Sequence, residues 1–496
     1  MNVRQTDVFV IGAGPAGLCA ALRLQQLGYR VMLIERSAQW PRPQIGEALT
    51  PGVRNIVDLL DANAALEGIP LVARLPARVR WRNTEAEDVM HGDSAVVERA
   101  RFDAALLLLA AKRGIGVLRP ARVLAYSGEA LAWHLEIGQE RGHERGTVHV
   151  QARFVIDASG RGSGAARLDC ARALAATWAE WHGADLSPDL SDTTRVEALE
   201  TGWLWGTRLP DRSYRVMLLA DPAAQRQTPG KPEGRLHAAC AASTLFLELA
   251  ALPSLTEIRV CSATPYLDTC AWRPGWIKTG DAAFAIDPIS SSGVEKAMRF
   301  SLQAVTAAHT FLQSGDPVQQ ALAGEFLEER LIETCARHCA WTRGYYGEAW
   351  CADTPFWHER SAPFLPTGVD AEQARWRARL EQHASHIDLA ATEPALPPAP
   401  PQRHEAIRFA PGLVTVRALC VVDDLVQERA ALAHPRLARP LAFYEDQPLL
   451  PALDILSHEP TFDEALHTLT ATMEQDKALR LLAWLWQQGV IESAGH

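Results

Sequence analysis

The chain opens with alternating apolar and glycine-rich segments. Residues 7–11 (DVFVI) are mostly β-branched or aromatic, which is typical of a buried strand. The glycine-rich stretch 12–17 (GAGPAG) follows at once. A helical run over 18–27 then stops at Gly28, a residue that favours the left-handed helix cap. A second apolar strand over 29–34 ends in an acidic residue, so the pattern predicts a strand–helix–strand unit.

The three glycines of this unit have the GxGxxG spacing. Gly12 permits a tight turn, Gly14 lets backbone N–H groups approach a pyrophosphate, and Gly17 lets the helix pack closely on the strand. The helix N-terminus presents the positive end of its dipole to the diphosphate. Glu35, at the end of the second strand, can accept hydrogen bonds from a ribose. A purely structural turn does not explain this acid, so the sequence predicts a dinucleotide site.

Three later segments extend the site. Residues 97–103 (VERARFD) begin a helix, and residues 154–160 (FVIDASG) form a strand that ends in a turn of small residues. Residues 278–283 (KTGDAA) come much later and are followed by 286–288 (IDP) and 290–294 (SSSGV).

Taken in this order and spacing, the segments resemble the FAD-dependent aromatic hydroxylase and flavin-dependent halogenase superfamily. Residues 41–49 (PRPQIGEAL) look like its halogenase-like branch. The resemblance covers about residues 5–360 and implies FAD as the cofactor. It also implies an α/β (α+β) fold, in which a Rossmann-like FAD domain carries an inserted mixed β-sheet substrate domain.

The resemblance implies a role for individual residues. Arg99 should lie near the flavin, Asp281 should bind the ribityl chain or pyrophosphate, and Asp287 with Pro288 should line the isoalloxazine. A helix predicted over 292–311 would direct its N-terminal N–H groups at reduced, anionic flavin, which its dipole stabilises. The complete set of expected FAD-binding residues is Gly12, Gly14, Pro15, Ala16, Gly17, Glu35, Arg36, Arg42, Glu47, Ala48, Arg99, Val123, Asp157, Gly160, Asp281, Pro288, Ser292, Gly293 and Val294.

Both chemistries of the superfamily begin with a flavin C4a-hydroperoxide, and a lysine separates them. In halogenases that lysine relays hypohalous acid to the substrate, and it falls in the region that matches residues 71–82 here. This region has four arginines and no lysine. Arginine stays protonated and is a poor nucleophile, so it does not replace the relay. The chain's lysines are Lys112, Lys231, Lys278, Lys296 and Lys477.

Two further departures favour hydroxylation. Ser290 stands where tryptophan halogenases carry a glutamate, and the halogenase tryptophan motif appears in altered form over 202–210. Trp203 and Trp205 of that motif are candidate substrate contacts, although tryptophans in such a position are more often part of a core. Arg80 is a third candidate, from an arginine cluster that is more often a solvated strand face.

One residue is a candidate for catalysis. A base near the substrate would assist hydroxylation, and Glu47 is the candidate because the resemblance places it close to the flavin. The alternative for Glu47 is a structural hydrogen bond in a turn.

Composition excludes several functions. The chain has 496 residues, 48% of them hydrophobic and 22% charged, which is typical of globular domains. The net charge of −10 and the lack of a basic patch argue against nucleic-acid binding. No apolar stretch is long enough to span a membrane, and no signal peptide is visible, so we expect a cytoplasmic protein.

Cysteine spacing adds little evidence for a metal. The nine cysteines form no CxxC pair. Cys335, His338 and Cys339 would share a helix face, but free cysteines are more often buried as small hydrophobic residues, so we expect no metal.

Boundaries follow from the same patterns. We expect the FAD domain at 1–80, 96–170 and 275–345, the substrate domain at 81–95 and 171–274, a helical segment at 346–390, a Pro-rich linker at 386–403 and a winged-helix-like domain at 404–496. In that last domain, residues 408–422 look like a strand pair around Pro411-Gly412. Thr461 looks like a helix N-cap. The last domain faintly resembles leader-peptide recognition domains; packing or dimerisation is the alternative.

These observations predict an FAD-dependent monooxygenase that acts on an aromatic group. In plan, the chain is similar to flavoprotein monooxygenases that hydroxylate a protein tryptophan during tryptophylquinone cofactor maturation in quinohaemoprotein amine dehydrogenase. The substrate would then be an aromatic group, such as a tryptophan of a polypeptide docked by the C-terminal domain. Electrons would come from NAD(P)H or a separate reductase that supplies reduced flavin. The alternatives are a halogenase of a carrier-bound or small aromatic substrate, and a flavoprotein reductase; the oligomeric state stays open.

Overall fold

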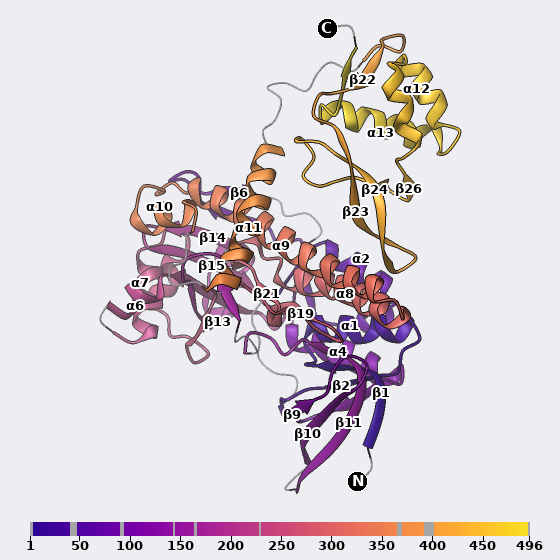
Figure 1. Ribbon diagram of the computed structural model, residues 1–496. Helices are drawn as coiled ribbons and strands as arrows, with labels where there is room; N and C mark the ends of the chain where they lie inside the picture. The colour runs from indigo at the N-terminus through magenta and orange to yellow at the C-terminus, as the bar shows by residue number, and fades with distance from the viewer. Residues whose placement is uncertain are drawn as a thin grey trace.

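The structure is a computed structural model with two large sheets and two smaller ones in its body, and a separate C-terminal domain (Figure 1). It describes residues 3–39, 47–89, 94–141, 144–162, 166–227, 230–364, 370–390 and 401–494.

The first sheet is parallel at its centre. β1 (Val3–Ile11) lies between β2 (Val31–Ile34) and β11 (Glu144–Asp157), and both neighbours run parallel to it. Val8 and Val10 are fully buried, as expected of a strand covered on both faces. The sheet continues through β8 (Gly116–Leu118) on one side and through β20 (Trp276–Lys278) and β19 (Trp272–Arg273) on the other; β10 (Trp133–Arg141) pairs with β11 and β9 (Ala121–Ser127).

Helices position the ends of this sheet. α1 (Pro15–Gln26) follows β1 directly and ends before Gly28, which has a φ of +86°, as the sequence predicts. α8 (Gly293–Gln313) packs beside α1, and α4 (Arg99–Lys112) also contacts α1. α9 (Pro317–Gly347) covers α8. The N-termini of α1, α4 and α8 therefore belong to one helical layer on the sheet.

A second sheet of seven strands corresponds to most of the predicted substrate domain. Its order is β17 (Arg259–Ser262), β13 (Ala175–His182), β16 (Ser213–Ala220), β15 (Gly202–Arg208), β14 (Thr194–Leu199), β5 (Ala77–Arg80) and β6 (Glu87–Val89). The parallel pairing of β14 with β5 brings residues 77–80 into this sheet, although the predicted boundary leaves them in the FAD domain. β7 (Ala95–Val97) begins in the segment 81–95 that was predicted for the substrate domain. It pairs with β3 (Ala48–Leu49) and β4 (Leu71–Ala73), which lie in the predicted FAD domain.

Shorter elements complete the body. They are α2 (Gly52–Leu59), α3 (Asn63–Leu66), α5 (Pro188–Ser191), α6 (Pro222–Gln227), α7 (Pro232–Ala241), α10 (Pro355–Ser361), α11 (Ala371–Ala390), β12 (Arg167–Asp169), β18 (Tyr266–Asp268), β21 (Phe284–Ala285) and the 3-10 turns η1 (Gly183–Asp185), η2 (Leu247–Ala251), η3 (Gly280–Ala282) and η4 (Pro288–Ser290).

The C-terminal domain has its own apolar core. β22 (Ile407–Phe409) pairs with β27 (Ile491–Ser493), and η5 (Ala452–His458), α12 (Phe462–Leu469) and α13 (Gln475–Gln487) pack against this pair. The predicted N-cap is present, because the side chain of Thr461 accepts from the N–H of Glu464 and Glu464 accepts from the N–H of Thr461. β25 (Phe443–Tyr444) and β26 (Gln447–Pro448) form a small ribbon.

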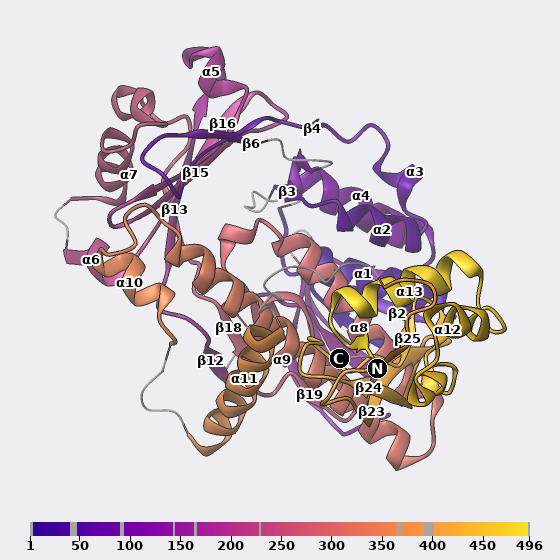
Figure 2. The same ribbon diagram turned by 90° about the horizontal axis from the view of Figure 1, so that it is seen from above.

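A hairpin joins this domain to the body. The strand pair predicted around Pro411-Gly412 is wrong: β23 (Val414–Val422) pairs with β24 (Leu425–Ala433) around Asp423 and Asp424. Both aspartates have positive φ values, 51° and 64°, as a two-residue hairpin turn requires. The hairpin reaches down to α8 and α1 (Figures 1 and 2).

Two contacts fix the hairpin on the body. The N–H of Val426 donates to Thr310 Oγ1 of α8 at 2.8 Å, and Arg23 of α1 pairs with Asp424 at 2.6 Å. Val426 itself is fully buried in the main core. Thr310 lies 17 residues after Gly293, so the hairpin meets α8 about 25 Å from its N-terminus.

Candidate active site

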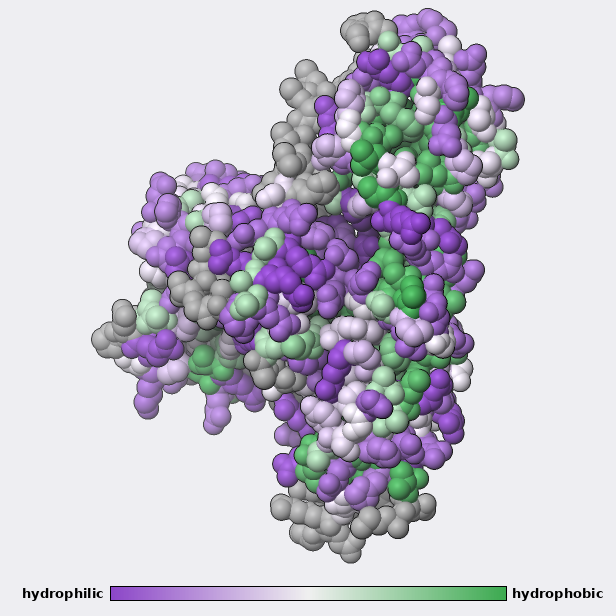
Figure 3. Space-filling view, in the orientation of Figure 1, coloured by the Kyte–Doolittle hydropathy of each residue, from purple (hydrophilic) through white to green (hydrophobic). Residues whose placement is uncertain are grey.

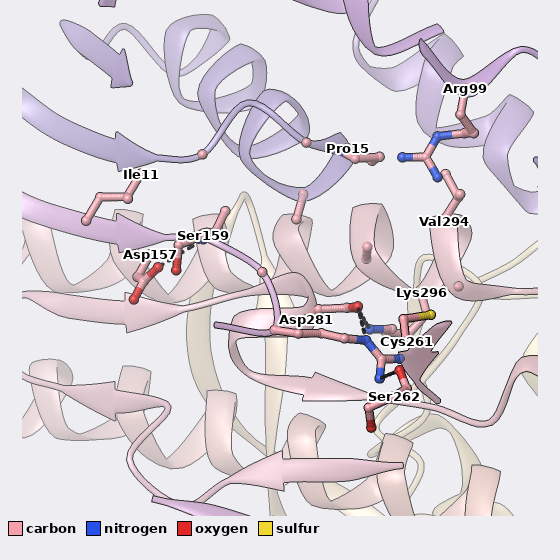
Figure 4. A pocket seen from close by; sticks show the side chains of 18 of the residues that line it. Ile11, Pro15, Arg99, Asp157, Ser159, Cys261, Ser262, Asp281, Val294 and Lys296 are labelled. Atoms are coloured by element: carbon pink, nitrogen blue, oxygen red, sulfur yellow. Dashed lines mark hydrogen bonds and ion pairs between the residues drawn. The ribbon is translucent and has the colours of Figure 1, made fainter. Parts of the chain in front are cut away.

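A cavity of about 980 Å³ lies between the two sheets. Its lining comes from the C-terminal ends of β1 and β11, the N-termini of α1 and α8, and strands β13, β15 and β16 of the second sheet. Figure 4 shows this cavity with labelled side chains from β1, α1 and α8 and from the end of β11. The Rossmann-like sheet therefore meets the second sheet at this cavity.

The glycine turn makes the phosphate end of the cavity. Gly12 has a φ of +102°, and a Cβ there would clash with the carbonyl of Ala158. Gly14 has an ordinary φ of −81°, and no atom lies within 4 Å of the position that its Cβ would take. Gly17 does not line the cavity; a Cβ there would clash with the carbonyl of Gly12, so its role is close packing. The turn leaves a space into which α1 directs its N-terminus, which fits a pyrophosphate.

Glu35 is held by backbone donors at the cavity edge. The N–H of Ala13 donates to Glu35 Oε2 at 3.0 Å, and the N–H of Ser37 donates to Oε1 at 2.8 Å. The residue is 2% exposed and lines the cavity. Its carboxylate is therefore fixed in the orientation that a ribose hydroxyl would need.

An ion pair stands at the middle of the cavity. Lys296, in the first turn of α8, donates to Asp281 Oδ1 at 2.9 Å and to the carbonyl of Phe284 at 2.7 Å. Arg161 pairs with Asp281 Oδ2 at 3.1 Å (Figure 4). Burial raises the pKa of Asp281, but the charges of Lys296 and Arg161 outweigh it and leave that pKa below its ordinary value. Asp281 is therefore an ionised acceptor with its orientation fixed.

A chain of hydrogen bonds connects Trp203 of the second sheet to Asp287, which precedes α8. The Trp203 indole N–H donates to the Tyr346 hydroxyl at 3.1 Å, and that hydroxyl donates to both carboxyl oxygens of Asp287 at 3.0 Å. The N–H of Asp287 donates to His338 Nε2 at 2.9 Å. Burial raises the pKa of Asp287 to about 6 and lowers the pKa of His338 to about 4. Trp203 and Asp287 both line the cavity.

Most of the predicted residues line this cavity. They are Gly12, Gly14, Pro15, Ala16, Glu35, Arg36, Glu47, Ala48, Arg99, Val123, Asp157, Gly160, Asp281, Pro288, Gly293, Val294, Trp203 and Trp205. Ser292 precedes the first residue of α8 and is not in the lining. Arg42 lies outside the described residues.

Arg80 is placed away from the cavity. Its guanidinium pairs with the buried Glu197 at 2.8 Å and lies over the ring of Trp350, 4.7 Å from its centroid. A buried carboxylate explains this arginine without a substrate, because an unpaired charge there would be costly. The prediction that Arg80 contacts the substrate therefore has no support from the geometry.

Glu47 is held in a buried ion pair with Arg215 of β16. Arg215 also pairs with Glu180 and lies over the ring of Trp178, 4.6 Å from its centroid. Burial lowers the pKa of Arg215 to about 10, so it remains charged at neutral pH. The pair joins the FAD side to the substrate sheet, and it favours a structural role for Glu47 over the predicted base.

Sequence reasoning missed Lys296, Arg161 and Tyr346. Lys296 follows the SSSG turn and was visible as a charge in the first turn of a helix, whereas Tyr346 lies 59 residues from its partner. Within the described residues, no group of three or more His, Cys, Asp or Glu side chains could hold a metal. Within the same residues, no helix is both long enough and apolar enough to cross a membrane.

Comparison with known proteins supports a flavin site. The family model described as FAD dependent oxidoreductase matches residues 7–240. A tryptophan 2-halogenase of Chondromyces crocatus is 29% identical over 385 residues, which are 73% of this chain and 72% of that protein. A putative FAD-dependent oxidoreductase, LodB, of Marinomonas mediterranea is 25% identical over 377 residues, 72% of this chain and 97% of that one.

Two solved structures match nearly the whole chain. The peptidyl tryptophan dihydroxylase QhpG has a TM-score of 0.71 at 23% identity, covering 98% of this chain and 99% of that chain. The flavin-dependent halogenase CmlS has a TM-score of 0.73 at 21% identity, covering 99% and 97%. The chain thus has the fold of these two flavoprotein structures, and its residues 7–240 match the FAD dependent oxidoreductase family model.

Proposed function

We propose that this FAD-dependent oxidoreductase is a monooxygenase that inserts oxygen into an aromatic group, and that the group is a tryptophan side chain of a peptide or protein. Bound, reduced FAD would supply an activated oxygen atom. The turn at Gly12 and Gly14 and the carboxylates of Glu35 and Asp281 would bind it. The protein would hold the ring and exclude water.

The bonds made by Lys296, a lysine that lines the cavity, are the observation that carries this proposal. All five lysines of the chain lie in described residues, and among them Lys296 lines the cavity. Its amine donates to Asp281 and to the carbonyl of Phe284, and its side chain is 5% exposed. An ammonium held by a carboxylate has no lone pair with which to attack hypohalous acid, so Lys296 is no halogen relay.

The substrate end of the cavity suits an indole. Trp203 and Trp205 line it together with Met217, Ala176 and Ala263. These side chains are mainly apolar, and an aromatic ring packs well against such a lining. A bound aromatic ring would displace water from this part of the cavity, which would protect an activated oxygen.

A polypeptide substrate is supported by the likeness in fold to QhpG, a peptidyl tryptophan dihydroxylase. The C-terminal domain is the candidate docking site, and apolar residues gather on its face in Figure 3. Its hairpin contacts α8 about 25 Å from the N-terminus of that helix, which lies at the cavity. A substrate segment of about eight extended residues would span the distance from the hairpin to the cavity. We propose NAD(P)H or a separate reductase as the electron source.

Halogenation of an aromatic substrate is the second candidate, because the tryptophan 2-halogenase is 29% identical over 73% of this chain. Product mass distinguishes the two. Reduced holoenzyme would be incubated with oxygen, chloride, bromide and a tryptophan-containing polypeptide encoded beside the gene. Mass gain from labelled oxygen supports the monooxygenase, and a halogen isotope pattern would overturn it.

A further inference from the structure

Oxygen transfer to an aromatic ring leaves a proton that must be removed. A ring carbon forms a bond to the delivered hydroxyl oxygen while the bond between that oxygen and its donor breaks, and the electron pair of the broken bond stays with the donor. The ring carbon then carries both the hydroxyl group and a hydrogen, and the ring bears positive charge. The carbon–hydrogen bond must break, its electron pair returns to the ring, and the proton passes to a base. A positioned base near the ring accelerates such a step. The cavity therefore needs a carboxylate or imidazole with an open lone pair.

The cavity offers few candidates for this base. Glu47 is neutralised by Arg215, Asp281 accepts from Lys296 and Arg161, and the ring nitrogen Nε2 of His338 is occupied by a backbone N–H. Two further carboxylates lie at the glycine-turn end of the cavity: Glu35 accepts from the N–H groups of Ala13 and Ser37, and Asp157, beside Ile11 in the sheet, accepts from the N–H of Ser159. Asp287 remains, at the junction of the flavin and substrate sides.

We propose that Asp287 is the catalytic base that accepts the ring proton, and that Tyr346 positions it. This inference rests on the proposed function, since it assigns a proton-transfer step to the same site. Asp287 Oδ1 accepts from the N–H of Ile289 and from Tyr346, whereas Oδ2 accepts from Tyr346 in the described part of the chain. Oδ2 thus keeps a lone pair for a proton.

The bonds of Tyr346 favour an ionised carboxyl group. The Tyr346 hydroxyl accepts from Trp203 and donates to Asp287, so its proton points at the carboxylate. The same chain fixes the indole of Trp203, which lines the substrate end. A single tyrosine therefore sets the distance between the base and the substrate wall.

The charges around Asp287 keep its protonation sensitive to pH. Three side chains of α9 lie near Asp287: Tyr346, His338 and Cys339. The charge of Arg360, from α10, also acts on Asp287. Lys296, from α8, acts on the neighbouring His338. Burial dominates this set and brings the pKa of Asp287 to about 6. At pH 7 the group is mostly ionised, and after it takes a proton it can release it again near neutrality.

A structural role is the alternative, because Asp287 also caps η4 through Ile289. Asp287→Asn retains an oxygen for this cap and removes the base, so it separates the two. We expect the variant to keep its FAD content and KM, and to lose about 100-fold in kcat. The acid limb of the wild-type pH profile near pH 6 should disappear.

Three measurements complete the test. An infrared carboxyl band that titrates near pH 6 in the wild type should be missing in Asp287→Asn. A deuterated ring should give a larger isotope effect in this variant, because proton removal becomes slow. Tyr346→Phe should move the acid limb to higher pH, since the anion loses a donor.

The outcomes are distinguishable from failure of the proposed function. If the wild type forms no modified aromatic product, the monooxygenase proposal fails. If it forms the product and Asp287→Asn matches its kcat, or retains the acid limb, Asp287 is not the base. If Asp287→Asn loses FAD, the pH–rate profile of Tyr346→Phe decides. An acid limb at the same pH as in the wild type would then contradict the inference.

Discussion

Lys296 Nζ lies 2.9 Å from Asp281 Oδ1, and this ion pair ties the first turn of α8 to the loop of η3. The lysine is 5% exposed at its side chain and the aspartate 38%. Because one partner is buried and the other faces the cavity, the pair links two elements of the fold and holds a fixed anion at the cavity, where we propose that it contacts FAD. Its removal should therefore affect both stability and flavin binding.

Lys296→Met tests this pair. We expect it to lower the free energy of unfolding by roughly 1–3 kcal/mol, less than a fully buried pair costs, because Asp281 is partly exposed and Arg161 remains. Urea unfolding of the FAD-free protein would measure it. Lys477→Met, which removes a surface ion pair, is the matched control and should change stability little. Equal stability of both variants would contradict the account.

The pair also predicts how stability depends on pH. The pKa of Asp281 is lowered in the folded protein, so its stabilisation is fully present above the ordinary aspartate pKa of about 4. It is lost as the pH falls through the lowered pKa. Asp281→Asn should consequently be less stable than the wild type at pH 7 and differ less at pH 3. Thermal unfolding at both pH values measures this; a constant difference would rule it out.

Gly14→Val and Gly12→Val should behave differently. Gly14 has an ordinary φ and open space at its Cβ, so valine should fold normally and block the pyrophosphate. Gly12 has a φ of +102° and a backbone carbonyl in the way, so valine should destabilise the protein itself. The absorbance of bound flavin and thermal unfolding separate the effects. A yellow, fully loaded Gly14→Val protein would disprove the phosphate site.

Local patterns predicted the parts of the site that are near one another in sequence. Gly12, Gly14 and Glu35 belong to one strand–helix–strand unit, and their spacing alone specifies the turn and the acid. The bond between Tyr346 and Asp287 joins two elements 59 residues apart, and no local pattern encodes it. The hairpin turn was misplaced for another reason. Gly412 does adopt a positive φ of 97°, as a turn signal predicts, but β22 before it pairs with β27 and β23 after it pairs with β24, so the hairpin forms around Asp423 and Asp424.

Thr310→Val tests how the C-terminal domain is attached. Thr310 Oγ1 accepts from the N–H of Val426 at a buried contact between α8 and the hairpin. Valine would leave this N–H without its partner, at a cost of about 1–3 kcal/mol. Limited proteolysis should then cut the hairpin faster. Thr334→Val, whose hydroxyl bonds to a carbonyl of its own helix, is the control. If both variants resist the protease equally, the hairpin is held by other contacts.

The mass of the product tests the central claim most directly. Reduced holoenzyme would receive isotopically labelled oxygen, chloride and bromide together with a tryptophan-containing polypeptide, and the product would be analysed by high-resolution mass spectrometry. The account predicts a gain of about 18 or 36 mass units on tryptophan when the supplied oxygen is oxygen-18, in place of the roughly 16 or 32 that ordinary oxygen would give. A chlorine or bromine isotope pattern on that residue would contradict it, and would require a halogen relay other than Lys296.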